Sequence, residues 1–196
     1  MRKPEMTLCQ KEWKTLDSVL GFFAFAAFFL GDYNDWKWGI RGLRLCFPAG
    51  VLLLIAGTIW MAMEGTAPNR GVPRGMMAAL AVLFFLLLVR TLFFALPAEA
   101  SYTRPGERRP VRRSGVYALC RHPGVLWFGG LYLCLWPALG VPLWAGAAYT
   151  GLDVLLVLFE DRWVFPAVLD GYPEYRKVTP FLIPTADSIR ACVKEK

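Results

Sequence analysis

Five apolar runs, each close to the length that a helix needs to cross a bilayer, constrain this chain more than any other feature. A membrane-spanning helix takes about 20 residues, because the hydrocarbon core of a bilayer is about 30 Å thick. The runs cover residues 16–31, 43–63, 76–97, 125–139 and 141–159. Connectors rich in Gly, Pro, Asn and Asp separate the first three runs, as turns should. The pattern predicts an all-α fold, a polytopic membrane bundle of about five transmembrane helices.

The composition agrees with a membrane protein and excludes several other classes. Hydrophobic residues make up 56% of the chain, which is too apolar for an ordinary soluble domain. The net charge is +7, but the basic residues lie between the apolar runs rather than along one polar face, so we expect no nucleic-acid partner. The five cysteines and the single histidine show no zinc spacing, so the sequence predicts neither a metal site nor structural disulfides.

The orientation in the membrane follows from the arginine-rich segment 98–121, which we expect to be an irregular loop. The positive-inside rule places this loop and the C-terminal tail in the cytosol. Five crossings then put the N-terminus outside, although Arg2, Lys3, Lys11 and Lys14 oppose this. The N-terminal lead is long and mixed in charge, with no clear cleavage site after the run, so we expect a retained helix and not a signal peptide. The expected location is the cell or inner membrane, or the endoplasmic reticulum in a eukaryote.

The chain divides into two parts at the end of the third run. Residues 1–97 carry three N-terminal transmembrane helices, and residues 98–196 carry the basic loop, a helical hairpin and a C-terminal tail. The hairpin turns at "GVP", residues 140–142, where proline does little harm to either helix. The tail predicts a short amphipathic helix over about 172–178, followed by "TPFLIP", which returns to the membrane surface.

Charged residues at membrane depth are costly and are therefore candidates for function. Arg90 lies within the third run, close enough to its end to extend its head to the interface; the alternative is binding of an anionic head group. Asp153 and Glu160 are seven residues apart, with Leu156 between them, and so lie on nearly one helix face. Their acidic stretch either forms a site or caps the helix at the interface.

The only histidine stands in "YALCRHPGVLW". Pro123 suits the first turn of a helix, so Arg121 and His122 precede a helix N-terminus, where an anion is stabilised. The alternative is an interfacial Arg-His pair that faces lipid phosphates.

Three blocks of the C-terminal half resemble the isoprenylcysteine carboxyl methyltransferase and phospholipid methyltransferase superfamily. They are "SGVYALCRHPGVLWFGGLYL", an acidic pair that closes a helix, and a Y-R-x-x-x-P-x-x-x-P tail. The resemblance covers roughly residues 100–185. The residues that carry it are Gly115, Tyr117, Arg121, His122 and Pro123, then Glu160 and Asp161, then Tyr175, Arg176, Pro180 and Pro184.

The resemblance implies an integral-membrane methyltransferase that uses S-adenosyl-L-methionine without a Rossmann domain. The cofactor would occupy a cytosolic pocket between the last two helices, the preceding loop and the tail, and a lipophilic substrate would enter from the bilayer. Arg121 and Glu160 would be catalytic. The implied cofactor contacts are Tyr117, His122, Pro123, Gly124, Val125 and Glu160, with Val111 and Arg112 adding backbone contacts.

Two departures from the family pattern bear on the substrate. Val125 replaces a tyrosine, and Leu156 replaces the arginine that members acting on prenylcysteine carry one turn before the glutamate. A buried substrate carboxylate would then lack a cation. We therefore expect another lipophilic or small acceptor, such as an amine lipid, a thiol or a hydrophobic acid, with Arg90, Asp153 and Leu156 as candidate substrate residues. Asp153 suits a cationic amine.

Two other functions compete with this prediction. Membrane sterol reductases share a similar tail and use NADPH, although they are usually longer. A non-catalytic membrane scaffold of the same fold would explain Val125 and Leu156.

Overall fold

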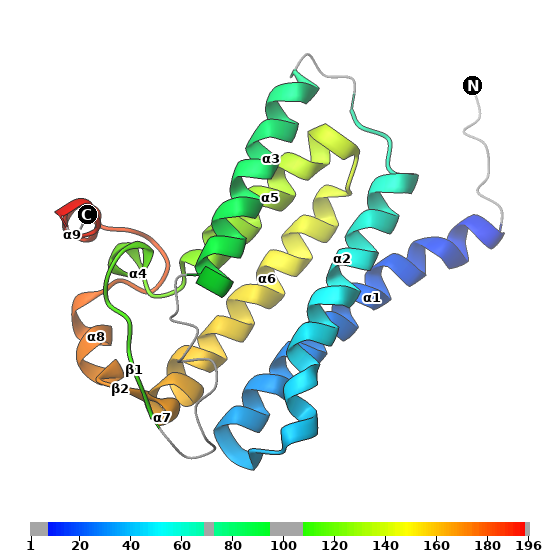
Figure 1. Ribbon diagram of the computed structural model, residues 1–196. Coiled ribbons are helices and arrows are strands. Elements are labelled where there is room, and N and C mark those ends of the chain that lie inside the picture. Colours follow the sequence, from blue (N-terminus) through cyan, green and yellow to red (C-terminus); the bar gives the residue numbers. More distant parts are fainter. Residues whose placement is uncertain (1–7, 69–72, 95–107, 195–196) are drawn as a thin grey trace.

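The structure, a computed structural model, describes residues 8–68, 73–94 and 108–194, and it is predominantly helical (Figure 1). The η elements are single 3-10 or π-helical turns. In chain order the elements are α1 (Leu8–Tyr33), η1 (Asn34–Trp38), η2 (Arg41–Leu45), α2 (Cys46–Glu64), α3 (Arg74–Val89), η3 (Arg90–Phe94), β1 (Arg109–Pro110), α4 (Val116–Leu119), α5 (Pro123–Leu139), α6 (Leu143–Phe159), η5 (Glu160–Val164), α7 (Phe165–Val168), β2 (Leu169–Asp170), α8 (Tyr172–Val178) and α9 (Ala186–Lys194).

The predicted all-α class is confirmed, but fewer helices than predicted are long and apolar enough to cross a membrane. Within the described residues there are three such helices, at Arg41–Glu64, Arg74–Phe93 and Leu143–Val168. The helix α5 is apolar, but it has only 17 residues between Pro123 and the Gly140 turn. At about 1.5 Å per residue it is about 25 Å long, which is short of the hydrocarbon thickness. Among the residues that the structure describes, three candidate spans thus stand against the five that were expected.

The contacts between the five long helices give the order α3, α5, α6, α1, α2. The helices α1 and α2 form one antiparallel hairpin, and α5 and α6 form a second one. Aromatic rings fill the space between α1, α5 and α6. The Phe25 and Phe128 rings are 6.2 Å apart, and those of Tyr132 and Tyr149 are 5.6 Å apart in an edge-to-face contact. The polar-tipped Tyr149 is fully buried, so this is the core of the bundle.

The predicted tight hairpin at residues 140–142 is confirmed, since α5 ends at Leu139 and α6 begins at Leu143. Gly140 closes α5 with φ 80°, and its N–H donates to the Trp136 carbonyl at 2.9 Å. A Cβ on Gly140 would lie 2.7 Å from the Ala67 nitrogen, so the turn lies directly against the α2–α3 connection. Both connections are thus at the same end of the bundle.

The opposite end carries the C-terminal elements. The strands β1 and β2 pair in parallel, with Arg109 opposite Leu169. The segment 98–121 is therefore not wholly irregular, since it contributes β1 and the turn α4; its residues 98–107 lie outside the described residues. The predicted amphipathic helix is confirmed as α8. The helix α9, which no sequence pattern predicted, packs against α4.

Candidate functional site

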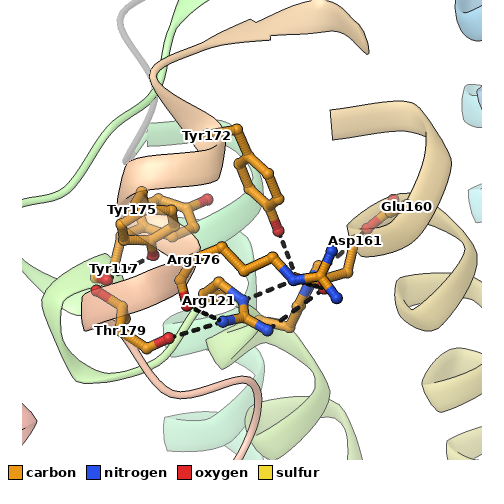
Figure 2. A network of polar contacts seen from close by, with 9 residues as sticks. Tyr117, Arg121, Glu160, Asp161, Tyr172, Tyr175, Arg176 and Thr179 are labelled. Atoms are coloured by element: carbon orange, nitrogen blue, oxygen red, sulfur yellow. Dashed lines mark hydrogen bonds and ion pairs between the residues drawn. The ribbon is translucent and has the colours of Figure 1, made fainter. Parts of the chain in front are cut away.

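A buried ion pair between Arg121 and Asp161 lies at the centre of the candidate site. The Arg121 Nε donates to Asp161 Oδ1 at 2.7 Å, and Nη2 donates to Oδ2 at 3.3 Å (Figure 2). The two side chains are 9% and 6% exposed. This two-point geometry is the strongest that an arginine and a carboxylate form. The pair joins the start of α5 to η5 at the end of α6.

The same guanidinium also forms hydrogen bonds with the C-terminal tail. Arg121 Nη1 donates to the carbonyls of Arg176 and Thr179 at 2.9 and 2.8 Å. The Arg121 backbone N–H donates to the Pro180 carbonyl at 2.9 Å, and the His122 backbone N–H donates to the Phe181 carbonyl at 3.3 Å. The tail therefore crosses over the R-H-P block.

Tyrosines of α8 complete the cluster (Figure 2). The Tyr172 hydroxyl donates to Asp161 Oδ1 at 2.6 Å, and the Tyr175 hydroxyl donates to the Tyr117 carbonyl at 2.6 Å. Arg176, which is half-exposed, places its Nε 3.4 Å from Asp161 Oδ2. Asp161 thus receives two arginines and a phenol, which offset the cost of burying a carboxylate.

The His122 imidazole lies between two carboxylates and two phenyl rings. Its Nδ1 is 3.6 Å from Glu160 Oε2, and its Nε2 is 3.5 Å from Asp161 Oδ1. It stacks on Phe165 at 5.6 Å and meets the edge of Phe181 at 5.2 Å. Within the described residues, Nε2 is a buried nitrogen without a hydrogen-bond partner. Burial lowers the pKa of His122 below its ordinary value, although Asp161 opposes this shift, so the ring is neutral at pH 7.

Glu160 faces away from the Arg121 pair and meets α1. Its side chain is 17% exposed, and its carboxyl group hydrogen bonds with that of Asp32, at the end of α1. Such a bond requires a proton on one of the two carboxyl groups. Asp153 adds a further nearby charge from one face of α6. The site therefore has an acidic side, formed by α1 and α6, which faces the Nδ1 edge of the His122 ring, while the unpartnered Nε2 lies on the Asp161 side.

The remaining predicted cofactor residues are spread more widely. The Tyr117 hydroxyl donates to the Thr91 carbonyl at 3.1 Å, towards the end of α3, and burial raises the pKa of Tyr117 to about 12. A Cβ on Gly124 would lie 3.8 Å from Leu88, so Gly124 also faces α3. Val125 and Pro123 are buried. Of the predicted contacts, the structure brings His122 and Glu160 together, while Tyr117 and Gly124 face another helix.

The weaker candidates lie at the margins of the site. Val111 bonds to the Asp170 carbonyl at 3.0 Å, and Arg112 is exposed. Arg90 is exposed at the start of η3, where its head can extend beyond the apolar run. Asp153 is half-buried. Leu156 is buried in the hydrophobic core, at the position where superfamily members that act on prenylcysteine carry an arginine.

The alternative of an Arg-His pair facing lipid phosphates does not hold, because both side chains are buried and contact protein groups. The Glu-Asp-Arg stretch is not a simple cap either. Asp161 faces inward, while Arg162 is exposed over the Trp163 ring.

Six residues of the cluster were not predicted as site residues: Asp32, Asp161, Tyr172, Tyr175, Arg176 and Thr179. Asp161 was visible as half of the acidic pair, and Tyr172 lies within the predicted tail helix. No local signal identifies Asp32, because its contact with Glu160 depends on how α1 packs on the end of α6.

Among the residues that the structure describes, no group of three His, Cys, Asp or Glu side chains is arranged to hold a metal ion. The four cysteines with described side chains are free thiols. Comparisons with known proteins found no matching family model, no similar curated protein and no similar solved structure. What the cluster binds is therefore inferred from its own residues.

Proposed function

We propose that the protein is an integral-membrane methyltransferase that uses S-adenosyl-L-methionine on its cytosolic side and takes a lipophilic or small acceptor from the bilayer. One observation carries the proposal: the three sequence blocks that resemble this superfamily, far apart in the chain, meet in the cluster of Arg121, His122, Glu160, Asp161 and the tail. Short motifs that matched the superfamily only by chance would not be expected to come together in one cluster.

His122 and Glu160 are the residues best placed to hold the cofactor. S-adenosyl-L-methionine carries an ammonium, a carboxylate and a ribose diol, and its sulfonium supplies an activated methyl group. The Glu160 carboxylate suits the ammonium or the diol, and the unpartnered His122 Nε2 suits a hydrogen-bonding group of the cofactor. A buried nitrogen without a partner is costly, so a ligand that satisfies it gains affinity.

Arg121 acts as a positioning residue in this proposal. Its guanidinium is directed at Asp161 and at two tail carbonyls, so it holds the tail over His122. The catalytic role that the resemblance implies for Glu160 fits its place beside Asp32, where the two carboxyl groups can hold and release a proton.

The acidic side of the site favours a cationic amine as acceptor. Asp32 and Asp153 lie near Glu160, whereas Leu156 leaves that face of α6 without a cation. A substrate carboxylate there would be buried beside like charges. An amine would instead be stabilised by them.

A non-catalytic scaffold is the second candidate, because two groups predicted to bind ligand are satisfied within the chain. The Tyr117 hydroxyl bonds Thr91, and Arg121 bonds Asp161 and the tail. No comparable observation favours an NADPH-dependent reductase.

Binding of S-adenosylhomocysteine to the purified protein in detergent tests the proposal. We expect calorimetry to detect binding, and Glu160→Gln and His122→Ala each to weaken it by about 10- to 100-fold, the loss typical of a hydrogen bond to a charged group. Glu160→Gln should leave the thermal midpoint unchanged or higher, because it removes one charge beside Asp32.

Two variants control this experiment. Glu174→Gln changes an exposed glutamate of α8 and should leave binding unchanged. Asp161→Asn leaves Arg121 buried without its partner and should lower the free energy of unfolding by about 3 kcal/mol or more. Lack of binding in the folded wild type would favour the scaffold, and binding of NADPH alone would favour the reductase.

A further inference from the structure

The C-terminal helix α9 lies apart from the cluster described above, and its surface is divided lengthwise into three stripes. Ser188 is buried, on the side that packs against α4. Ile189 and Val193, one turn apart on the same face, are 48% and 66% exposed. Arg190 and Lys194 form the next stripe and are exposed, and Arg190 also lies 3.3 Å from the exposed Asp187 one turn earlier. An exposed apolar stripe beside a basic one is the pattern of a helix that lies in a membrane interface.

Local hydrogen bonds hold this helix in one orientation. The Thr185 N–H donates to Ser188 Oγ at 2.9 Å, and the Ser188 N–H donates to Thr185 Oγ1 at 3.2 Å. These reciprocal bonds cap the first turn. Because Ser188 also faces α4, the direction in which Ile189 and Val193 point is set by the fold.

Contacts with the bundle place α9 at the level where the membrane spans end. The span Arg74–Phe93 ends close to Thr91, whose carbonyl accepts the Tyr117 hydroxyl. Tyr117 belongs to α4, and α4 packs against α9 (Figure 1). The apolar stripe is therefore next to the boundary between hydrocarbon and head groups.

The tail that precedes α9 carries two further exposed apolar side chains. Val178 is 75% exposed and Ile183 is 81% exposed, and both come after the last segment long enough to span. Exposed apolar side chains beyond the spans need a cover other than water. A second copy of the chain is not a suitable cover. So few side chains would bury far less surface than the roughly 1,200 Å² that a stable dimer interface needs.

We propose that α9 is an interfacial helix that binds the anionic cytosolic leaflet of the membrane that holds the bundle. Ile189 and Val193 enter the acyl boundary, while Arg190 and Lys194 contact lipid phosphates. The helix follows directly from the tail segment that bonds Arg121 and His122, so its binding anchors the far end of that segment. This inference does not depend on methyltransferase activity.

Hydrogen exchange of the full chain in nanodiscs, with one copy per disc, tests this proposal. In discs that contain phosphatidylglycerol, we expect the amides of 189–194 to exchange about tenfold more slowly in the wild type than in an Ile189→Ser, Val193→Ser double variant. Ala191→Ser, on an exposed part of α9 away from the stripe, should match the wild type. Arg190→Gln with Lys194→Gln should remove the difference between phosphatidylglycerol and pure phosphatidylcholine discs.

A photo-crosslinking amino acid gives a second measurement in an otherwise native chain. Placed at Val193 it should cross-link to lipid acyl chains, and placed at Ala191 it should not. Equal exchange in the wild type and the double variant, with unchanged exchange in α5 as evidence of folding, would overturn the proposal. Cross-links from Val193 to a second protein chain, or lipid cross-links of equal yield at both positions, would also overturn it.

Discussion

At the scale of single residues, Asp161 and Glu160 are neighbours in sequence that serve opposite purposes. Asp161 is surrounded by Arg121, Arg176 and Tyr172, so its charge is fully compensated and holds the tail. Glu160 meets another carboxyl group and the Nδ1 atom of the His122 ring, and among the described residues no arginine lies against it as Arg121 lies against Asp161. Compensated charge is typical of structural residues, and uncompensated charge is typical of binding sites.

The single histidine makes one property of this site directly measurable. Because His122 is the only imidazole in the chain, selective ¹³C labelling gives one resonance. Burial lowers the pKa of His122, against the effect of Asp161, so we expect the folded protein in detergent to titrate below 6.5. The unfolded chain should titrate near 6.5. A folded midpoint at or above 6.5 would mean that the carboxylates outweigh burial.

The same pKa shift has a defined effect on stability. The unfolded state binds the proton more tightly than the folded state, so His122 contributes stability above about pH 6.5 that is lost as the pH falls below that value. His122→Gln should remove this part of the pH dependence of the thermal midpoint.

At the scale of elements, close helix approach holds the N-terminal hairpin together. Gly50 of α2 faces α1, and a Cβ there would lie 2.6 Å from Phe28 Cε1 and 2.9 Å from the Ala24 carbonyl oxygen. The carbonyl belongs to the backbone and has little freedom to move. The end of this hairpin is closed by Asn34, which is fully buried and bonds both the N–H and the carbonyl of Ile40 at 2.8 and 3.1 Å. These contacts position the end of α1, and with it Asp32.

Two glycine substitutions test this packing. Gly50→Ala should push α1 and α2 apart and lower the free energy of unfolding by about 1–3 kcal/mol. Gly151→Ala in α6, where a Cβ meets nothing within 4 Å, should be neutral or stabilise by up to about 1 kcal/mol through helix propensity. Thermal midpoints in one detergent give the comparison. Equal midpoints for both variants would show that the α1–α2 contact is loose.

At the scale of the whole molecule, the two ends of the bundle differ in charge. The end that carries the candidate site also carries Lys37, Arg41 and Arg44 in the α1–α2 connection and the arginines that precede α5. The other end carries Arg74 next to the α2–α3 connection, and α1 begins there with Lys11 and Lys14 in its first turns. By the positive-inside rule we therefore predict that the site end faces the cytosol.

Thiol labelling in intact cells tests this orientation. Thr66→Cys and Arg41→Cys are both exposed and lie at opposite ends of the bundle. A membrane-impermeant maleimide should label position 66 in intact cells and position 41 only after lysis. Buried Cys120, whose pKa burial raises to about 11, should remain unlabelled in the folded protein. The reverse pattern at 66 and 41 would place the site outside the cell.

The sequence by itself determined the helices, the hairpin and the tail helix, because these depend on residues a few positions apart. Run length predicts where a helix forms, and Gly140 and Pro142 predict where two helices turn. Run length alone overstated the membrane crossings, since α5 is cut short between Pro123 and Gly140.

The tertiary structure alone decided which charges meet. Arg121 and Asp161 are 40 residues apart, and nothing local to either specifies the other as partner. Asp32 reaches Glu160 only because α1 packs beside α6 and η5, and the Tyr117 hydroxyl is directed at α3 and not at the cluster. Such contacts depend on the packing of whole helices, which depends on side chains far apart along the chain.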